Sequence, residues 1–422
     1  MKKLFRMLLM MLVLTMGTGL TSCDWSENGD NPVIPVGSTV IPVNLAALTS
    51  ADVNADGEFV VTDGTILTGT LDGETQKIKI AIADGATVTL SNATINGKNT
   101  DDSHELWAGL TCLGDATIIL EGTNAVQNFN RHYPGLQPGP EGTTLTIRGN
   151  GSLTATSREY GAGIGTKYED GSCGNIRIEG GTVTATGHWE SAGIGSSYVS
   201  TCGDITITGG TVTASGGTNG AGIGTGNSIV GRSRCGDITI SGGTVKATGS
   251  GHGAGIGTGR GNYDDDTSQC GTITISGSAQ VTATGDNDGA GIGTGQFGKC
   301  GNISISGGTV MARGVNSAPG IGTGQDGRCG DISITKGKDF DSVTAIRGSG
   351  ANRSIGTYDG FSDYLVSVCG RITFGGKEIF NGIDDFYDVP EDKVYGDLRF
   401  TKTTTDDGND DTDDTTNTWT LK

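Results

Sequence analysis

The side chains best suited to recognise a ligand are a few aromatic and acidic residues in segments otherwise rich in glycine. Trp189 lies between His188 and Glu190, and Tyr160 precedes Trp189 by 29 residues. An aromatic ring flanked by acids and amides suits the apolar face of a sugar ring. We therefore expect a carbohydrate-binding site at Trp189, Tyr160, His188 and Glu190, with Tyr263 as a further member. The alternative is that these rings only pack over a corner of the fold.

Acidic residues form a second group with possible chemistry. Carboxylate oxygens are the ligands that Ca²⁺ prefers, so calcium is the one cofactor that the sequence suggests. A hydrated acidic loop is the alternative reading, and no other cofactor is expected. The candidate metal ligands are Asp264, Asp265, Asp266, Asp286 and Asp288.

No catalytic residue can be assigned from the sequence. Glycoside hydrolysis needs two opposed carboxylates at a defined separation, and the chain offers no convincing pair. Residues 251–253 resemble the Gly-His-Gly motif of polygalacturonases, but the rest of that catalytic set is absent, so His252 is read as loop variation. The glycine-rich run at 253–259 lacks the Lys-Ser/Thr of a phosphate loop, and it occurs in several copies. We therefore expect a protein without catalytic activity.

A repeated triplet indicates the elements that must position these side chains. Six Gly-Ile-Gly copies occur at steps of 29 to 36 residues, and a Ser-Ile-Gly copy follows at 354–356. Each copy is followed by Cys-Gly, then Ile-x-Ile, usually Gly-Gly, and then Val-x-Ala. Such recurrence is typical of a solenoid. The six copies lie at 163–165, 193–195, 222–224, 255–257, 291–293 and 320–322.

Apolar residues alternate with a period of two within each copy. Ile205 and Ile207 alternate with Thr206 and Thr208, a pattern that predicts strands. Glycines at the corners allow the sharp turns between strands. We predict an all-β protein, a single parallel β-helix of about ten three-strand coils, and we expect it to be right-handed.

The repeat, together with the composition before and after it, divides the chain into five segments. An aromatic C-terminal cap would cover the open end of the β-helix, where unpaired strand edges invite aggregation. The Thr/Asp-rich tail after it should be solvated. The segments are a signal peptide at 1–22, a lipid anchor and linker at 23–50, the β-helix at 51–375, the cap at 376–400 and the acidic tail at 401–422.

Seven of the nine cysteines occupy one repeat position, so they should stack in a column. Their Cα atoms would be about 4.8 Å apart, which is within disulfide range, but side chains in parallel register point alike and disfavour the bond. Buried thiols, some disulfides and a metal site remain alternatives, in that order of preference. The seven are Cys173, Cys202, Cys235, Cys270, Cys300, Cys329 and Cys369.

Charge limits the class of partner. The chain has 47 acidic and 28 Lys or Arg residues, a formal net charge of −19. Such an acidic chain repels phosphate backbones, so we expect no nucleic-acid partner.

The N-terminal segment predicts an exported protein. Lys2, Lys3 and Arg6 precede an apolar run at 8–13, which is typical of a secretion signal. The sequence Leu-Thr-Ser-Cys that ends at Cys23 resembles the lipobox of bacterial lipoproteins. That resemblance implies cleavage before Cys23 and a lipid on its thiol, and hence a membrane contact at the outer membrane or cell surface. The acidic residues that follow are similar to the surface-export signals of Bacteroidota lipoproteins. The alternative to the lipobox is an ordinary signal peptide in which the cysteine occurs by chance.

The repeat contains the pattern GAGIGT…CGDITISGGTVTATG, which is similar to glycine-rich β-helical repeats of bacterial surface proteins described as carbohydrate-binding. The resemblance covers 160–375 strongly and 55–160 weakly, and relatives of those proteins belong to the pectate-lyase-like group. Because the fixed residues are core and corner residues, no site residue is carried over. We predict a lipid-anchored surface protein that binds a polysaccharide or host glycan. The alternatives are a structural or adhesive rod that contacts proteins, and a polysaccharide lyase or hydrolase.

Overall fold

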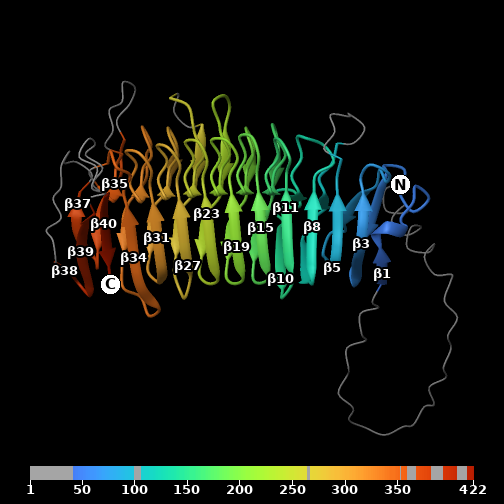
Figure 1. The fold of residues 1–422 in the computed structure, drawn as a ribbon, viewed down its shortest axis with the longest axis horizontal. Coiled ribbons are helices and arrows are strands. Elements are labelled where there is room, and N and C mark those ends of the chain that lie inside the picture. The colour runs from blue at the N-terminus through green and yellow to red at the C-terminus, as the bar shows by residue number, and fades with distance from the viewer. Residues whose placement is uncertain are drawn as a thin grey trace, which may run out of the picture. The chain divides into compact units, whose positions relative to one another are not determined.

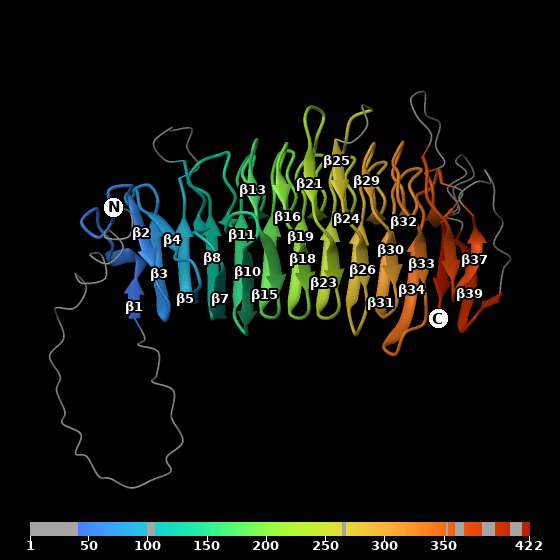
Figure 2. The ribbon, with the colours of Figure 1, turned by 180° about the vertical axis from the view of Figure 1, so that it is seen from behind.

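The described residues of the computed structural model form a β-solenoid whose coils stack along one axis (Figures 1 and 2). Among these residues the one helix is a 3-10 turn, η2 (Leu45–Ala47). Cys23 and the three aspartates at 264–266 lie outside the described residues. No helix in the part of the chain that is described could span a bilayer. The described ranges are 41–98, 106–263, 267–351, 353–358, 367–381, 393–405 and 416–422.

One sheet collects the Gly-Ile-Gly triplets and their counterparts in the first coils. It has 11 strands within the described residues. Ile194 pairs in parallel with Ile164 on one side and Ile223 on the other, and all three are fully buried. The strands are β2 (Glu58–Val61), β4 (Lys79–Ile82), β6 (Leu110–Cys112), β9 (Leu136–Gln137), β12 (Ile164–Gly165), β16 (Ile194–Gly195), β20 (Ile223–Gly224), β24 (Ile256–Gly257), β28 (Ile292–Gly293), β32 (Ile321–Gly322) and β35 (Ile355–Gly356).

A larger sheet holds the other two segments of each coil. It has 24 strands in the described part of the chain. The Ile-x-Ile strands and their equivalents are β7 (Ala116–Glu121), β10 (Thr144–Gly149), β14 (Asn175–Ile178), β18 (Ile205–Ile207), β22 (Ile238–Ile240), β26 (Ile273–Ile275), β30 (Ile303–Ile305), β33 (Ile332–Ile334) and β36 (Ile372–Phe374). The Val-x-Ala strands are β8 (Thr123–Gln127), β11 (Ser152–Thr156), β15 (Thr182–Thr186), β19 (Thr211–Ser215), β23 (Thr244–Thr248), β27 (Gln280–Thr284), β31 (Gly308–Arg313) and β34 (Phe340–Ile346). The first coils contribute β1 (Ile41–Asn44), β3 (Thr65–Asp72) and β5 (Ala86–Asn96).

The cysteine segments form a third, smaller sheet that the sequence did not predict as separate strands. Cys202 pairs in parallel with Cys173 and with Cys235. The central coils therefore contain four short strands rather than three. This sheet has five strands among the described residues, β13 (Ser172–Cys173), β17 (Thr201–Cys202), β21 (Ser233–Cys235), β25 (Ser268–Cys270) and β29 (Lys299–Cys300).

The second glycine of each triplet is required by close contact between coils. Gly224 has φ +134°, and a Cβ atom placed on it would lie 1.8 Å from the carbonyl oxygen of Gly257 in the next coil. That φ belongs to a region that side-chain-bearing residues rarely adopt. The structure confirms the predicted parallel β-helix, and the eleven strands of the triplet sheet agree with about ten expected coils.

Within the predicted solvated tail at 401–422, the described residues 401–405 and 416–422 correct the prediction. β39 (Leu398–Thr405) pairs antiparallel with β40 (Thr416–Leu421), and β40 also pairs antiparallel with β34. Trp419 and Leu421 are buried, and the Trp419 ring lies 5.4 Å from that of Phe400. The Thr/Asp composition gave no indication of these two strands. Their pairing covers an exposed strand edge at the last coil and so stabilises that end of the solenoid. β37 (Lys377–Phe380) and β38 (Val394–Tyr395) complete this end.

Candidate functional site

Two rows of loop side chains flank the Gly-Ile-Gly strands. The first row lies three residues before each triplet, and the second lies three residues after its last glycine. Side chains in successive coils stack along each row, as His132 does on Tyr160 and Tyr168 on Tyr198, with ring centroids 5.3 and 5.0 Å apart. The first row carries His132, Tyr160, Glu190, Asn219, His252 and Asp288, and the second carries Tyr168, Tyr198 and Asn227.

Five rings from these loops form what we call the aromatic cluster: His132, Tyr160, Tyr168, Trp189 and Tyr198. The Tyr160 ring is central, 4.8 Å from Tyr168 and 6.3 Å from Trp189 between centroids. Exposure rises across the cluster, from 8% for Tyr198 to 57% for Trp189. The cluster therefore has a buried base and an exposed ring at its outer side.

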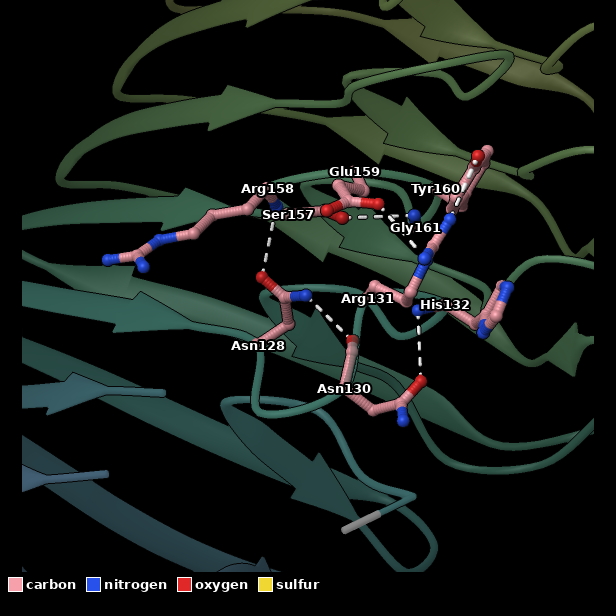
Figure 3. A network of polar contacts seen from close by, with 9 residues as sticks. All are labelled: Asn128, Asn130, Arg131, His132, Ser157, Arg158, Glu159, Tyr160 and Gly161. Atoms are coloured by element: carbon pink, nitrogen blue, oxygen red, sulfur yellow. Dashed lines mark hydrogen bonds and ion pairs between the residues drawn. The ribbon is translucent and has the colours of Figure 1, made fainter. Parts of the chain in front are cut away.

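A cation and an acid border Tyr160. Arg131 donates a hydrogen bond from Nη2 to the Tyr160 hydroxyl at 3.1 Å, and its guanidinium lies 4.9 Å from the centre of the ring. The same side chain pairs through Nε with Glu159 Oε2 at 3.0 Å. Figure 3 shows Arg131 and His132 reaching Tyr160 from the preceding coil. The Arg131–Glu159 pair therefore adds polar groups to the border of an otherwise aromatic cluster.

Buried polar residues fix the loop that presents Arg131 and His132. The Asn128 side chain donates to the Asn130 carbonyl at 2.7 Å and accepts from the Arg158 N–H at 3.0 Å (Figure 3). Asn130 in turn accepts from the His132 N–H at 3.0 Å. Asn128 and Asn130 are almost fully buried, so these bonds satisfy groups that would otherwise destabilise the fold.

Two buried serines hold Tyr160 from the next coil. Ser197 Oγ donates to the Tyr160 carbonyl at 2.6 Å and Ser191 Oγ at 2.5 Å. Ser191 and Ser197 are fully buried. Because the backbone of Tyr160 is held by bonds from the neighbouring coil, its ring is set before any ligand binds.

Glu190 adopts a backbone conformation that its residue type disfavours. Its φ is +61°, whereas Asn219, at the same position in the next coil, has φ +62° and is of a type that tolerates this region. Glu190 Oε2 accepts from the Tyr168 hydroxyl at 3.2 Å, and Oε1 accepts from the Asn227 amide at 2.9 Å. Burial and the negative charge of Glu190 raise the pKa of Tyr168. Such backbone strain is typical of functional sites.

A second group, the His252 cluster, comprises His252, Asp288 and Tyr358 farther along the solenoid. His252 Nδ1 lies 3.3 Å from Asp288 Oδ2, and the Tyr358 hydroxyl donates to Asp288 Oδ1 at 3.1 Å. The hydrogen bond with His252 lowers the pKa of Asp288, despite its burial. Burial, followed by the charge of Asp288, raises the pKa of Tyr358 to about 12. The carboxylate is thus occupied by internal partners.

The structure brings together only some of the residues that the sequence nominated. Tyr160, Trp189 and Glu190 belong to one site, and His188 is exposed beside it. Tyr263 lies elsewhere, in a ring pair with Phe297 at 6.2 Å. His132, Arg131 and Asn227 were missed, although the three-residue spacing from the triplet could have identified His132 and Asn227.

The aspartates nominated for calcium are placed separately. Asp286 accepts backbone N–H bonds from Gly251 and Asn287, both at 2.9 Å, and Asp288 belongs to the His252 cluster. Within the described ranges, no group of three or more His, Cys, Asp or Glu side chains is arranged to hold a metal ion. Asp264, Asp265 and Asp266 fall outside those ranges.

Comparison with known proteins identifies the class of protein. The family described as Beta helix repeat matches residues 145–166, 176–198, 205–227, 238–260, 273–296 and 303–325. These matches coincide with the coils that carry the triplets. No curated protein and no solved structure matches the chain. Fold and repeat together define a β-helix repeat protein.

Proposed function

We propose that this β-helix repeat protein binds carbohydrate through the aromatic cluster, without catalysis. The observation that carries the proposal is the Trp189 ring, 57% exposed beside the preorganised Tyr160 ring. Burial of an exposed indole against the apolar face of a sugar ring is favourable, and Trp189 offers such a surface.

The polar groups around the rings support recognition of hydroxyl groups. Arg131, Glu159 and Glu190 lie at the border of Tyr160 and Tyr168, where they can exchange hydrogen bonds with a sugar. Carbohydrate sites combine an apolar platform with a few polar groups that set orientation.

The carboxylates of the cluster support binding rather than hydrolysis. Glu159 is paired with Arg131, and Glu190 accepts hydrogen bonds from Tyr168 and Asn227. A glycosidase needs one carboxyl group whose pKa is raised and a second that faces it across the bond to be cleaved. These two carboxylates are instead engaged by neighbouring side chains of the cluster.

A glycan array tests the proposal. The chain from residue 24 onward is applied with and without calcium, and we expect retention of a polysaccharide or host glycan. Absence of binding in both conditions would overturn the proposal and leave the structural or adhesive rod. Release of soluble products from a polysaccharide would instead indicate a lyase or hydrolase. A requirement for calcium would show that the ion takes part in glycan binding, as the sequence suggested.

We also propose that a lipid on Cys23 anchors the protein at the outer membrane or cell surface. The lipobox-like sequence before Cys23 supports this location. Cys23→Ser should move the protein from the membrane fraction to the soluble fraction and abolish labelling by a fatty-acid analogue. Unchanged membrane retention and labelling would reject the anchor.

A further inference from the structure

The cysteine column is a feature that carbohydrate binding does not use. Cys173, Cys202, Cys235, Cys270 and Cys300 pair in parallel register, each with its neighbour in the next coil. Isolated parallel β-bridges pair the backbone of Lys299 with Arg328 and that of Arg328 with Val368. They extend the same alignment to Cys329 and Cys369. All seven are buried and carry free thiols. Seven sulfur atoms therefore form one row along the solenoid.

The sulfur atoms are close together and lie just below the surface. Cys173 Sγ and Cys202 Sγ are 3.3 Å apart. The exposed fraction of the cysteines rises from 1% at Cys173 to 7% at Cys270 and 9% at Cys300. A surface depression of about 380 Å³ is lined by Cys202, Cys235 and Cys270. A small ion can therefore approach the row from solvent.

The spacing of the row suits two-coordinate binding of a soft cation. Twice a metal–thiolate bond of about 2.3 Å is about 4.6 Å, close to the rise of about 4.8 Å between coils. Soft thiolate ligands select ions such as Cu(I), whereas zinc requires four ligands in a tetrahedron and calcium requires oxygen. A straight row gives an ion one sulfur from each of two consecutive coils, which is a linear arrangement. The Cys173 and Cys202 sulfur atoms, 3.3 Å apart without an ion, would have to separate to about 4.6 Å to hold one in this way.

We infer that the cysteine column binds soft, thiophilic d¹⁰ cations such as Cu(I), each held between the sulfur atoms of two consecutive coils. Two thiols release two protons, and each resulting thiolate donates an electron pair to the ion, whose oxidation state does not change. The Cu(I) complex with two thiolates carries one negative charge.

A matched pair of variants tests adjacency at a constant number of thiols. Both carry Cys23→Ser in the full chain. The alternating variant (Cys202→Ser, Cys270→Ser and Cys329→Ser) keeps four column thiols, none in consecutive coils. The contiguous variant (Cys300→Ser, Cys329→Ser and Cys369→Ser) keeps four in consecutive coils. Reduced protein is titrated anaerobically with Cu(I) against a competing chelator.

We expect the contiguous variant to bind Cu(I) at least 100-fold more tightly than the alternating variant. Cys112→Ser is the control, because Cys112 is buried and free but lies in β6, away from the column, and its loss should change nothing. Equal affinity of the two triple variants, or no binding by the parent chain, would overturn the inference. X-ray absorption of the Cu(I)-loaded parent chain gives the number of sulfur ligands per ion, and this measurement does not depend on how the variants fold. Two sulfur neighbours per ion are expected, and three or more ligands would contradict the site.

Discussion

The aromatic cluster and the His252 cluster occupy the same kind of loop in different coils of one solenoid. Tyr160 and Glu190 belong to the same row as His252 and Asp288. Each cluster also contains a tyrosine that donates to a carboxylate, Tyr168 to Glu190 at 3.2 Å and Tyr358 to Asp288 at 3.1 Å.

The two clusters differ in where their interactions are directed. Asp288 lies between His252 and Tyr358, so the carboxylate of the His252 cluster is turned toward internal neighbours. In the aromatic cluster the corresponding bonds hold the rings in place, and Trp189 faces solvent. A repeated scaffold can therefore carry an internal polar contact in one coil and the proposed recognition surface in another.

A break in the shared scaffold should have the largest effect. Gly224→Ala places a Cβ atom against the carbonyl of Gly257 and requires a strained φ of +134°. We expect a loss of about 3 kcal/mol or more in the free energy of unfolding, measured by denaturant titration. Thr239→Ala, on the outward side of β22, is the control and should change it by less than about 1 kcal/mol. A similar small loss for both variants would contradict the role assigned to the triplet glycine.

Removal of the exposed ring should separate recognition from stability. Trp189→Ala is expected to weaken binding of the array-identified glycan by about 2 kcal/mol, roughly 30-fold, with little change in unfolding. Isothermal titration provides the measurement. Tyr263→Ala removes a similarly exposed ring outside the cluster and should leave the affinity unchanged. Unaltered affinity of Trp189→Ala would reject the aromatic cluster as the sugar site.

The His252 cluster should contribute stability that depends on pH. Asp288→Asn removes a charged acceptor and is expected to lower the free energy of unfolding by about 1–2 kcal/mol at neutral pH. Because the folded pKa of Asp288 lies below its ordinary value of 3.8, the contribution is complete above that value. It is lost as the pH falls through the lower folded pKa. The difference between parent and variant should therefore shrink in acid, and a constant difference from pH 7 to pH 3 would refute the assignment.

The smallest effects should come from the two tyrosine hydroxyls. Tyr168→Phe and Tyr358→Phe each remove one hydrogen bond to a carboxylate, for an expected loss of about 1 kcal/mol. Only Tyr168→Phe should also reduce glycan affinity, because Tyr168 supports Tyr160 and Glu190. Equal affinities for the two variants would show that the hydroxyl–Glu190 bond does not shape the site.

Much of the fold could be predicted because it depends on short-range chemistry repeated many times. The alternation around Ile205 and Ile207 predicted strands, and the triplet spacing predicted the stacking of Ile164, Ile194 and Ile223. The cysteine column followed from the same reasoning, and its parallel register is confirmed. A one-residue slip would move every buried side chain outward, so the pattern leaves one register.

The candidate site was less predictable because its members come from coils with divergent loops. His132 precedes Gly-Leu-Gln at 135–137, which departs from the triplet sequence, so only the spacing could have placed it beside Tyr160. Tyr263 is an aromatic loop residue like Trp189, but it follows a triplet rather than preceding one, and it lies beside Phe297 instead. Composition also misled at the C-terminus, where threonine-rich segments became β39 and β40.

The sequence by itself determined the coil, its register and the row of cysteines, because each depends on residues whose size and backbone preference recur at fixed spacing. Tertiary structure alone decided which loop side chains meet. Glu190 reaches Tyr168 and Asn227 only through a left-handed backbone conformation, and Trp189 stays exposed beside Tyr160. It also decided that β40 covers β34, since an exposed strand edge is satisfied by whichever segment of the chain can reach it.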